Sequence, residues 1–135
     1  MWDTQSRLMG SPQLCIVAAS APRACEILRA LSFLSHPEVR TAKLFARHLD
    51  PADTESFLEN HFISAAVGTP RRFLQVVQAG SMLLDDCRVV LFDMGLDVKR
   101  YHVLSLLDTA ADAFELYRSF CRPCIEAQKM RIGFL

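Results

Sequence analysis

Residues 14–20 read Leu-Cys-Ile-Val-Ala-Ala-Ser, a short apolar run that leads directly into Ala21-Pro22-Arg23. An apolar run of this length without polar alternation is typical of a strand buried on both faces of a parallel sheet. Proline suits the first turn of a helix because an N–H there has no intrahelical partner. Apolar residues then recur at helical spacing as far as Leu34. The stretch therefore predicts a strand followed by a covering helix.

The same strand-then-helix order repeats along the chain. Asp50-Pro51 supplies an N-cap and a first-turn proline for a helix that reaches about residue 60, and Thr69 is expected to cap a helix that Gly80 ends. Further strands are predicted at 39–46, 62–67 and 87–92, and a helical stripe at 110–121. These units predict an α/β domain with a mainly parallel sheet covered by helices. We divide the chain into an N-terminal extension (1–13), this domain (14–122) and a C-terminal tail (123–135).

The composition fits one folded domain without a general attraction to nucleic acid or membranes. Of the 135 residues, 51% are apolar and 22% are charged, which is enough for one buried core. Fifteen basic and fifteen acidic residues cancel, so any contact with RNA must be local. The charge-free stretch 8–22 is short for a membrane span and is broken by Gly10 and Pro12. We expect an intracellular protein with no membrane segment, no secretory signal and no disulfide framework among its five cysteines.

Three loops are expected to meet at one edge of the sheet, because functional groups of open parallel sheets gather at the carboxyl ends of the strands. In this chain those ends are followed by residues 20–23, 68–72 and 93–100. A helix that begins near Thr69 would offer unpaired backbone N–H groups to a phosphate, and Arg72 would add a planar cation. The structural alternative is that Ser20 and Thr69 only cap their helices.

The three loops carry motifs that resemble those of DEAD-box helicases. Residues 66–72, Ala-Val-Gly-Thr-Pro-Arg-Arg, are similar to the Thr-Pro-Gly-Arg motif. Ser20-Ala21-Pro22-Arg23 is similar to the upstream RNA-contacting motif, and Val90-Leu91-Phe92-Asp93 resembles the approach to Asp-Glu-Ala-Asp. The motifs also occur in the helicase order. The resemblance implies a partial RecA-like domain of the helicase-lobe type.

A closer resemblance is to the Cms-type family, helicase-like proteins that are associated with small-subunit pre-ribosomes. Residues 42–48, Ala-Lys-Leu-Phe-Ala-Arg-His, resemble that family's Ala-Lys-Leu-Phe-Ala-Lys-His run, and residues 67–70 and 97–100 are similar to later segments. The similarity covers roughly residues 14–107 and omits the upstream half of the family's domain. It implies a nuclear and nucleolar protein whose partners are pre-ribosomal RNA and pre-ribosomal proteins. The oligomeric state stays open.

The resemblance also implies which residues bind RNA. The expected RNA-binding residues are Ser20, Arg23, Gly68, Thr69, Arg71 and Arg72. Arg71 stands where the family usually has a small residue. A secondary basic edge would consist of Lys43, Arg47, Lys99 and Arg100, for which ordinary solvated surface charge is the alternative.

Catalysis is not expected from this sequence. Asp93 and Asp97 form a degenerate acidic motif, in which Asp93 stands at the position of a helicase's magnesium-associated aspartate. Met94 follows it in place of the glutamate that would orient the hydrolytic water. The sequence contains no Gly-x-x-x-x-Gly-Lys-Ser/Thr phosphate loop. We therefore expect no catalytic residue, no cofactor and no bound metal, and we interpret Asp93 as structural.

Cys121-Arg122-Pro123-Cys124 has the spacing of a redox motif or of half a zinc site. It follows a predicted helix rather than a strand, and neither a second Cys-x-x-Cys nor a histidine pair completes a metal tetrad in the sequence. Inert, packed thiols are therefore the preferred interpretation.

The favoured hypothesis is a non-catalytic helicase-like module of small-subunit pre-ribosome assembly, which binds RNA, protein partners or both through the loop edge of its sheet. Two alternatives stay open. One is a protein–protein adaptor without RNA contact, which docks through an incomplete sheet edge or an exposed apolar helix. The other is a truncated lobe of an ATP-dependent RNA helicase whose phosphate loop lies in sequence outside this chain.

Overall fold

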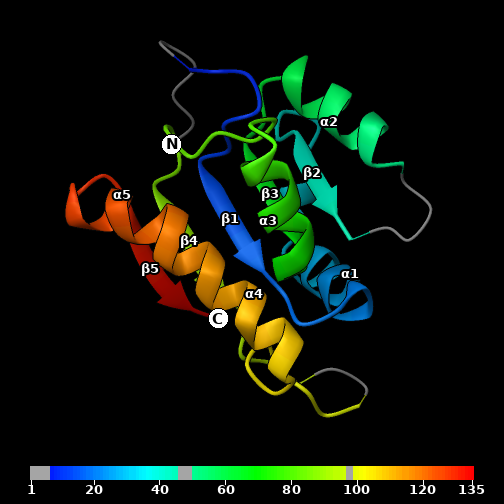
Figure 1. Ribbon diagram of the computed structural model, residues 1–135. Coiled ribbons are helices and arrows are strands. Elements are labelled where there is room, and N and C mark those ends of the chain that lie inside the picture. Colours follow the sequence, from blue (N-terminus) through cyan, green and yellow to red (C-terminus); the bar gives the residue numbers. More distant parts are fainter. Residues whose placement is uncertain (1–6, 46–49, 97–98) are drawn as a thin grey trace.

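The computed structural model describes residues 7–45, 50–96 and 99–135 and contains a five-stranded sheet in the order β2-β3-β1-β4-β5 (Figure 1). Every ladder between neighbouring strands is parallel. The strands are β1 Leu14–Val17, β2 Thr41–Leu44, β3 Ala65–Gly68, β4 Val89–Phe92 and β5 Arg131–Phe134. The predicted α/β architecture with a mainly parallel sheet is confirmed.

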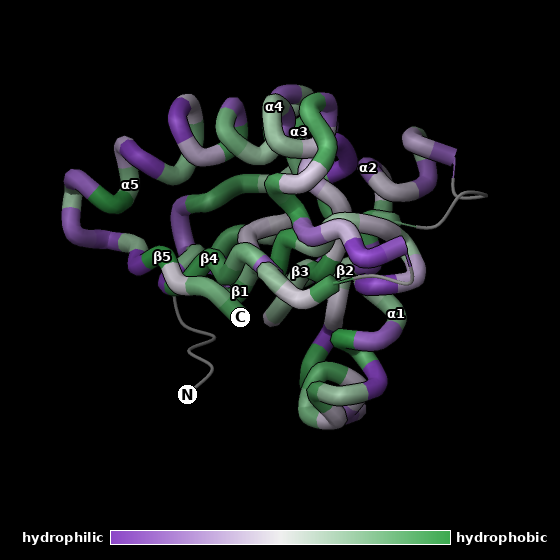
Figure 2. Tube along the Cα trace, turned by 90° about the horizontal axis from the view of Figure 1, so that it is seen from below, coloured by the Kyte–Doolittle hydropathy of each residue, from purple (hydrophilic) through white to green (hydrophobic). Residues whose placement is uncertain are grey.

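Helices cover the two faces of the sheet unequally. One face carries α1 (Ala21–Ala30), which continues into the short 3-10 helix η1 (Ser32–Ser35). The other face carries α2 (Pro51–Glu59), α3 (Pro70–Gln78), α4 (Leu107–Leu116), the π-helical turn η2 (Tyr117–Cys121) and α5 (Arg122–Glu126), as Figure 2 shows. None of the helices in the described ranges has the length and apolarity that a bilayer crossing requires.

The central strand β1 contributes side chains to both hydrophobic clusters of the core. Cys15 and Val17 pack into the cluster under α2–α5, whereas Ile16 and Ala18, the residue that follows β1, pack into the cluster under α1. None of the four is more than 2% exposed. Because both faces of β1 are dry, the run has no polar alternation, as the sequence analysis inferred.

All three predicted helix starts are confirmed, and two of the three N-cap residues make a side-chain capping hydrogen bond. The Ser20 hydroxyl accepts from the Arg23 N–H at 3.3 Å at the start of α1, and the Asp50 carboxylate accepts from the Ala52 N–H at 2.9 Å at the start of α2. Thr69 does stand at the N-cap position of α3, but its hydroxyl makes no capping hydrogen bond. The prediction of side-chain capping by Thr69 is therefore wrong.

Several element boundaries are shorter than predicted. The helix expected to run to Leu34 ends at Ala30, and Leu34 reaches the core from η1 instead. The strands β2, β3 and β4 have four residues each and are therefore shorter than the predicted strands. The residues that flank β3 and β4, such as Ile63 and Cys87, are buried without belonging to the strands. Because these flanking residues are apolar, the predicted strands were longer than the hydrogen-bonded ladders.

The C-terminal part of the chain departs most from the sequence analysis. The single stripe expected at 110–121 is divided among α4, η2 and α5. Pro123 cannot donate the helical hydrogen bond to the Ser119 carbonyl, and the helix widens over the preceding turn. The segment that we set apart as a tail contributes β5, which pairs with β4 from Val89↔Arg131 to Phe92↔Phe134.

Gly68 has a structural role at the end of β3. A Cβ atom added there would lie 2.4 Å from both the Cβ and the carbonyl oxygen of Leu44 on the neighbouring strand β2. At Gly133 in β5, an added Cβ would meet only the end of the flexible Leu91 side chain, at 2.9 Å. Close approach of β2 to β3 therefore requires glycine at position 68.

We predict that Gly68→Ala lowers the free energy of unfolding by about 1–3 kcal/mol, because the β2 backbone must shift. The matched variant Gly133→Ala should cost clearly less, because Leu91 can change rotamer. Urea unfolding monitored by circular dichroism measures both values. An equal or larger loss for Gly133→Ala would contradict this account of Gly68.

Candidate functional site at the carboxyl edge of the sheet

Three loops that the sequence analysis singled out lie beside one another at the carboxyl edge of the sheet. Val17 at the end of β1 pairs with Gly68 at the end of β3 and with Phe92 at the end of β4. The residues that follow these strand ends are therefore neighbours. Asp93 continues the ladder, since its N–H donates to the Val17 carbonyl at 2.9 Å. The expected meeting of these loops at one edge is confirmed.

The centre of this edge is an ion pair between Arg23 in the first turn of α1 and Asp93 after β4. The Nε of Arg23 donates to Oδ2 of Asp93 at 2.6 Å, and Nη2 donates to Oδ1 at 3.0 Å. The Asp93 side chain is 0% exposed and the Arg23 side chain is 23% exposed. The hydrogen bonds from Arg23 to Asp93 raise the pKa of the guanidinium further above its ordinary value. Arg23 is thus a permanent cation at this position.

Neighbouring groups complete the pair. The third guanidinium nitrogen, Nη1, donates to Oε2 of Glu26 at 2.9 Å, and the Gly95 N–H donates to Oδ1 of Asp93 at 3.1 Å. A Cβ added at Gly95 would lie 2.3 Å from Nη2 of Arg23. Gly95 therefore leaves the space that the guanidinium occupies.

The ion pair changes how Arg23 is understood. All three guanidinium nitrogens have carboxylate partners within the protein, a use that the sequence analysis did not anticipate when it assigned Arg23 to RNA. The interpretation of Asp93 as structural agrees with this geometry. A local signal did exist, because a buried aspartate after an apolar strand requires a cation or several hydrogen-bond donors, but it could not identify Arg23 as the partner.

A second feature of the edge is a cleft between β2, α2 and α3, with a volume of about 190 Å³. It brings together two basic residues that the sequence analysis placed in separate groups, Lys43 of β2 and half-buried Arg72 of α3. Glu55 is the acidic residue of the lining. The complete lining consists of Lys43, Leu44, Phe45, Pro51, Thr54, Glu55, Arg72, Gln75 and Val76. We call this feature the β2–α2–α3 cleft.

The remaining predicted residues are dispersed around this edge. Arg71 is 75% exposed and its Nη1 lies 3.8 Å from Oδ2 of Asp112 on α4, a separation at which an ion pair contributes little. Lys99 and Arg100 are exposed beyond β4. Arg47 and Asp97, which the sequence analysis assigned to the basic edge and the acidic motif, lie outside the described residues.

The Cys121–Cys124 pair lies on the helical face, away from the carboxyl-edge loops. Burial raises the pKa of the Cys121 thiol to about 12, and burial also raises the pKa of Cys124. Both shifts favour the thiol over the reactive thiolate. Within the part of the chain that the structure describes, no three His, Cys, Asp or Glu side chains are grouped as metal ligands. Packing is the role that this geometry supports.

Comparison with known proteins gives a consistent family match. A family model described as "CMS1: U3-containing 90S pre-ribosomal complex subunit" matches residues 3–135, a wider range than the resemblance noted in the sequence. Protein CMS1 of Chaetomium thermophilum is 30% identical over 108 residues, which are 79% of this chain. Human Protein CMSS1 is 25% identical over 121 residues, or 89% of this chain. In both cases the match spans 43% of the relative's length.

The Arg23–Asp93 pair makes a prediction about stability. Arg23→Met leaves a buried carboxylate without its cation and should lower the free energy of unfolding by about 3–5 kcal/mol. The control Glu26→Gln removes the more exposed partner of Arg23 and should cost less than about 1 kcal/mol. Replacing both members, in Arg23→Met/Asp93→Leu, should cost less than the sum of the single changes. Urea unfolding tests this, and additive losses would argue against a coupled pair.

Proposed function

This chain belongs to the CMS1 family of U3-containing 90S pre-ribosomal complex subunits, and from this premise we propose that it is a non-catalytic, RNA-binding module of small-subunit pre-ribosome assembly. The family membership supports the role in pre-ribosomes. The RNA contact is inferred from the carboxyl edge of the sheet. Pre-ribosomal RNA and pre-ribosomal proteins are the proposed partners, and the nucleus and nucleolus are the proposed location.

A relationship to the RecA-like helicase lobes is part of the proposal. It is supported by the three helicase-like segments, whose loops follow the adjacent strands β3, β1 and β4 of one parallel sheet. The carboxyl edge is where open α/β sheets hold their ligands. In this interpretation the chain retains the ligand-facing edge of such a lobe.

The observation that carries the non-catalytic part of the proposal is the Arg23–Asp93 pair. A hydrolase of this type needs its acidic residue to hold a metal ion at the nucleotide phosphates. Here both carboxylate oxygens of Asp93 accept hydrogen bonds from a guanidinium, at 2.6 and 3.0 Å. Releasing Asp93 for a metal would leave Arg23 without its main partner. The pair therefore favours a binding role over phosphate-bond hydrolysis.

The RNA contact is proposed at the β2–α2–α3 cleft and the adjacent start of α3. Lys43 and Arg72 line the cleft together. The backbone N–H groups of Arg71 and Arg72 lie in the first turn of α3 after Pro70, where a helix offers donors and a favourable dipole to a phosphate. With zero net charge on the whole chain, such a local group is the kind of site through which RNA would bind.

We predict that Lys43→Gln/Arg72→Gln weakens binding of single-stranded RNA and reduces the magnitude of the slope of log K against log[salt] by about 1.4, because about two phosphate contacts are lost at about 0.7 per contact. The matched control is Arg40→Gln/Arg88→Gln, which removes two exposed cations from the amino edge of the sheet. Fluorescence anisotropy with a labelled RNA at several salt concentrations measures both variants.

Control and cleft variants that weaken binding equally would indicate general charge attraction rather than a site. If the unmodified chain binds no RNA while it still associates with pre-ribosomal proteins, the adaptor alternative is correct.

We also predict that the chain releases no phosphate from ATP above the protein-free rate, with or without RNA, since Asp93 is bound to Arg23. A coupled phosphate-release assay with Mg–ATP checks this. RNA-stimulated turnover by the purified chain would support the helicase alternative and rule out the non-catalytic role.

A further inference from the structure

β5 is an edge strand, and its outer backbone groups pair with no other strand of the described residues. The Arg131 N–H donates to the Arg88 carbonyl at 2.8 Å, and the Leu135 N–H donates to the Phe92 carbonyl at 3.0 Å. Because a parallel ladder uses alternate residues, the N–H and C=O groups of Ile132 and Phe134 point away from β4. Within the described residues, no further strand pairs with this side of β5.

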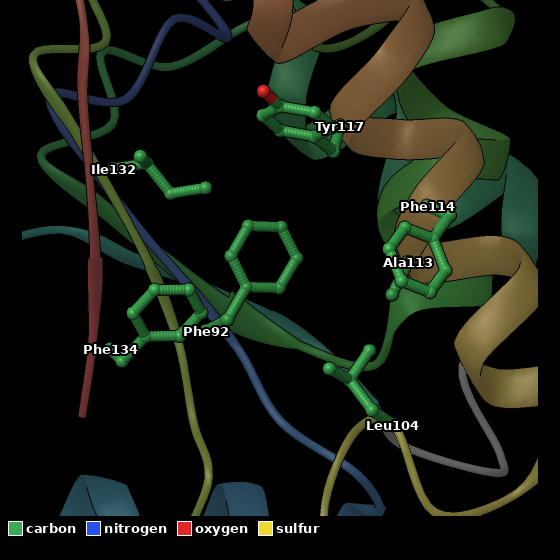
Figure 3. Close-up of a pocket in the computed structure, with 7 residues that line it drawn as sticks. All are labelled: Phe92, Leu104, Ala113, Phe114, Tyr117, Ile132 and Phe134. Atoms are coloured by element: carbon green, nitrogen blue, oxygen red, sulfur yellow. The ribbon is translucent and has the colours of Figure 1, made fainter.

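An open apolar groove of about 310 Å³ lies beside this edge, between the strands β4 and β5 and the helix α4 (Figure 3). The side chains of Ile132 and Phe134 enter it from β5, and Phe114 faces them from α4. Phe134 is 69% exposed and Phe114 is 60% exposed. The groove is therefore lined by aromatic surface that nothing in the described chain covers.

The opposite face of the sheet is also thinly covered near β5. Within the described ranges α1 is the α-helix on that face, and it contacts β3 (Figure 2). Leu91 of β4 is only partly buried at the margin of the α1 cluster. Parallel sheets normally have helices over both faces. In the part of the chain that the structure describes, the outer side of β5 thus has no strand partner, and neither face of the sheet is fully covered beside it.

We propose that the outer edge of β5 and the adjoining groove bind a β-strand with apolar side chains on alternate residues, which comes from the sequence that CMS1-family proteins carry outside the matched region. The match takes up 43% of the length of the Chaetomium and human relatives, so more than half of each relative lies outside it. This proposal concerns a protein–protein surface and does not depend on RNA binding at the carboxyl edge.

The geometry specifies how such a strand would bind. Its backbone would pair in parallel with the outward N–H and C=O groups of Ile132 and Phe134, as strands add to a free sheet edge. Alternate side chains would then fill the groove between Phe134 and Phe114. Around the α4 and α5 side lie the ion pairs Glu115–Arg118 and Arg122–Glu126. An apolar centre with a charged rim is the usual composition of a protein interface.

The test is a fusion of the whole chain with the sequence of the Chaetomium relative that lies outside the match. A long Gly/Ser linker joins the two, and their order along the fusion is the order in the relative. Amide hydrogen exchange at Ile132 and Phe134 should slow by about tenfold or more in the fusion, because these N–H groups gain partners. Amides of Ile16 and Val90 in the central strands provide an internal reference for folding.

Two substitutions are compared within this fusion. Phe134→Asp should restore the exchange rates of the unfused chain at Ile132, since it places a charge in the groove. Leu107→Asp changes a residue that is 85% exposed and outside the groove, and it should retain the slowed exchange. The unfused Phe134→Asp chain should keep the urea midpoint of the unmodified chain, which shows that the substitution acts on docking rather than on folding.

Exchange at Ile132 that is equally fast in the fusion and in the unfused chain would overturn the proposal, as would slowed exchange that survives Phe134→Asp. Sedimentation velocity tests the alternative that a second copy of this chain occupies the edge. If the unfused chain forms a dimer that Phe134→Asp abolishes, the edge pairs with itself and the proposed occupant is wrong. Loss of RNA binding in the cleft variants affects none of these outcomes.

Discussion

The bidentate pair between Arg23 and Asp93 is the interaction on which the carboxyl edge of this protein depends. It joins the first turn of α1, which covers one face of the sheet, to the end of β4 next to β1. Asp93 is completely buried, so its charge is tolerable only because a cation and the Gly95 N–H satisfy its oxygens. The space for the guanidinium exists because residue 95 is glycine. The positions of Arg23 and Asp93, their opposite charges and the space left by Gly95 together allow this ion pair to form.

This arrangement separates two kinds of surface on one small sheet. The carboxyl edge carries the charged and polar groups, including Lys43 and Arg72 in the β2–α2–α3 cleft. The β5 side carries exposed aromatic residues and a strand edge that no other described strand pairs with. The first surface is the one proposed for RNA binding, and the second is the one proposed for a polypeptide strand. The neutral overall charge is consistent with selective local contacts rather than a general affinity for polyanions.

Sequence reasoning predicted the features of this fold that are encoded locally. The apolar run of β1, the Ser20 and Asp50 caps and the convergence of three loops each follow from neighbouring residues. The Arg23–Asp93 pair joins residues 70 positions apart, so no local pattern could identify the partners. β5 escaped prediction because most of its residues are exposed, so it lacks the apolar run that marks the other strands, and because Pro123 disrupts the helix before it.

The central claim is that Asp93 is held by Arg23 and is not available as a metal-binding carboxylate. Nuclear magnetic resonance of the Arg23 Nε–H group tests it most directly, since that group donates to the buried Asp93 oxygen. The account predicts a slowly exchanging Nε–H signal whose position is unchanged when Mg–ATP is added. A signal that exchanges rapidly with water, or one that moves on addition of Mg–ATP as the carboxylate is released, would contradict it.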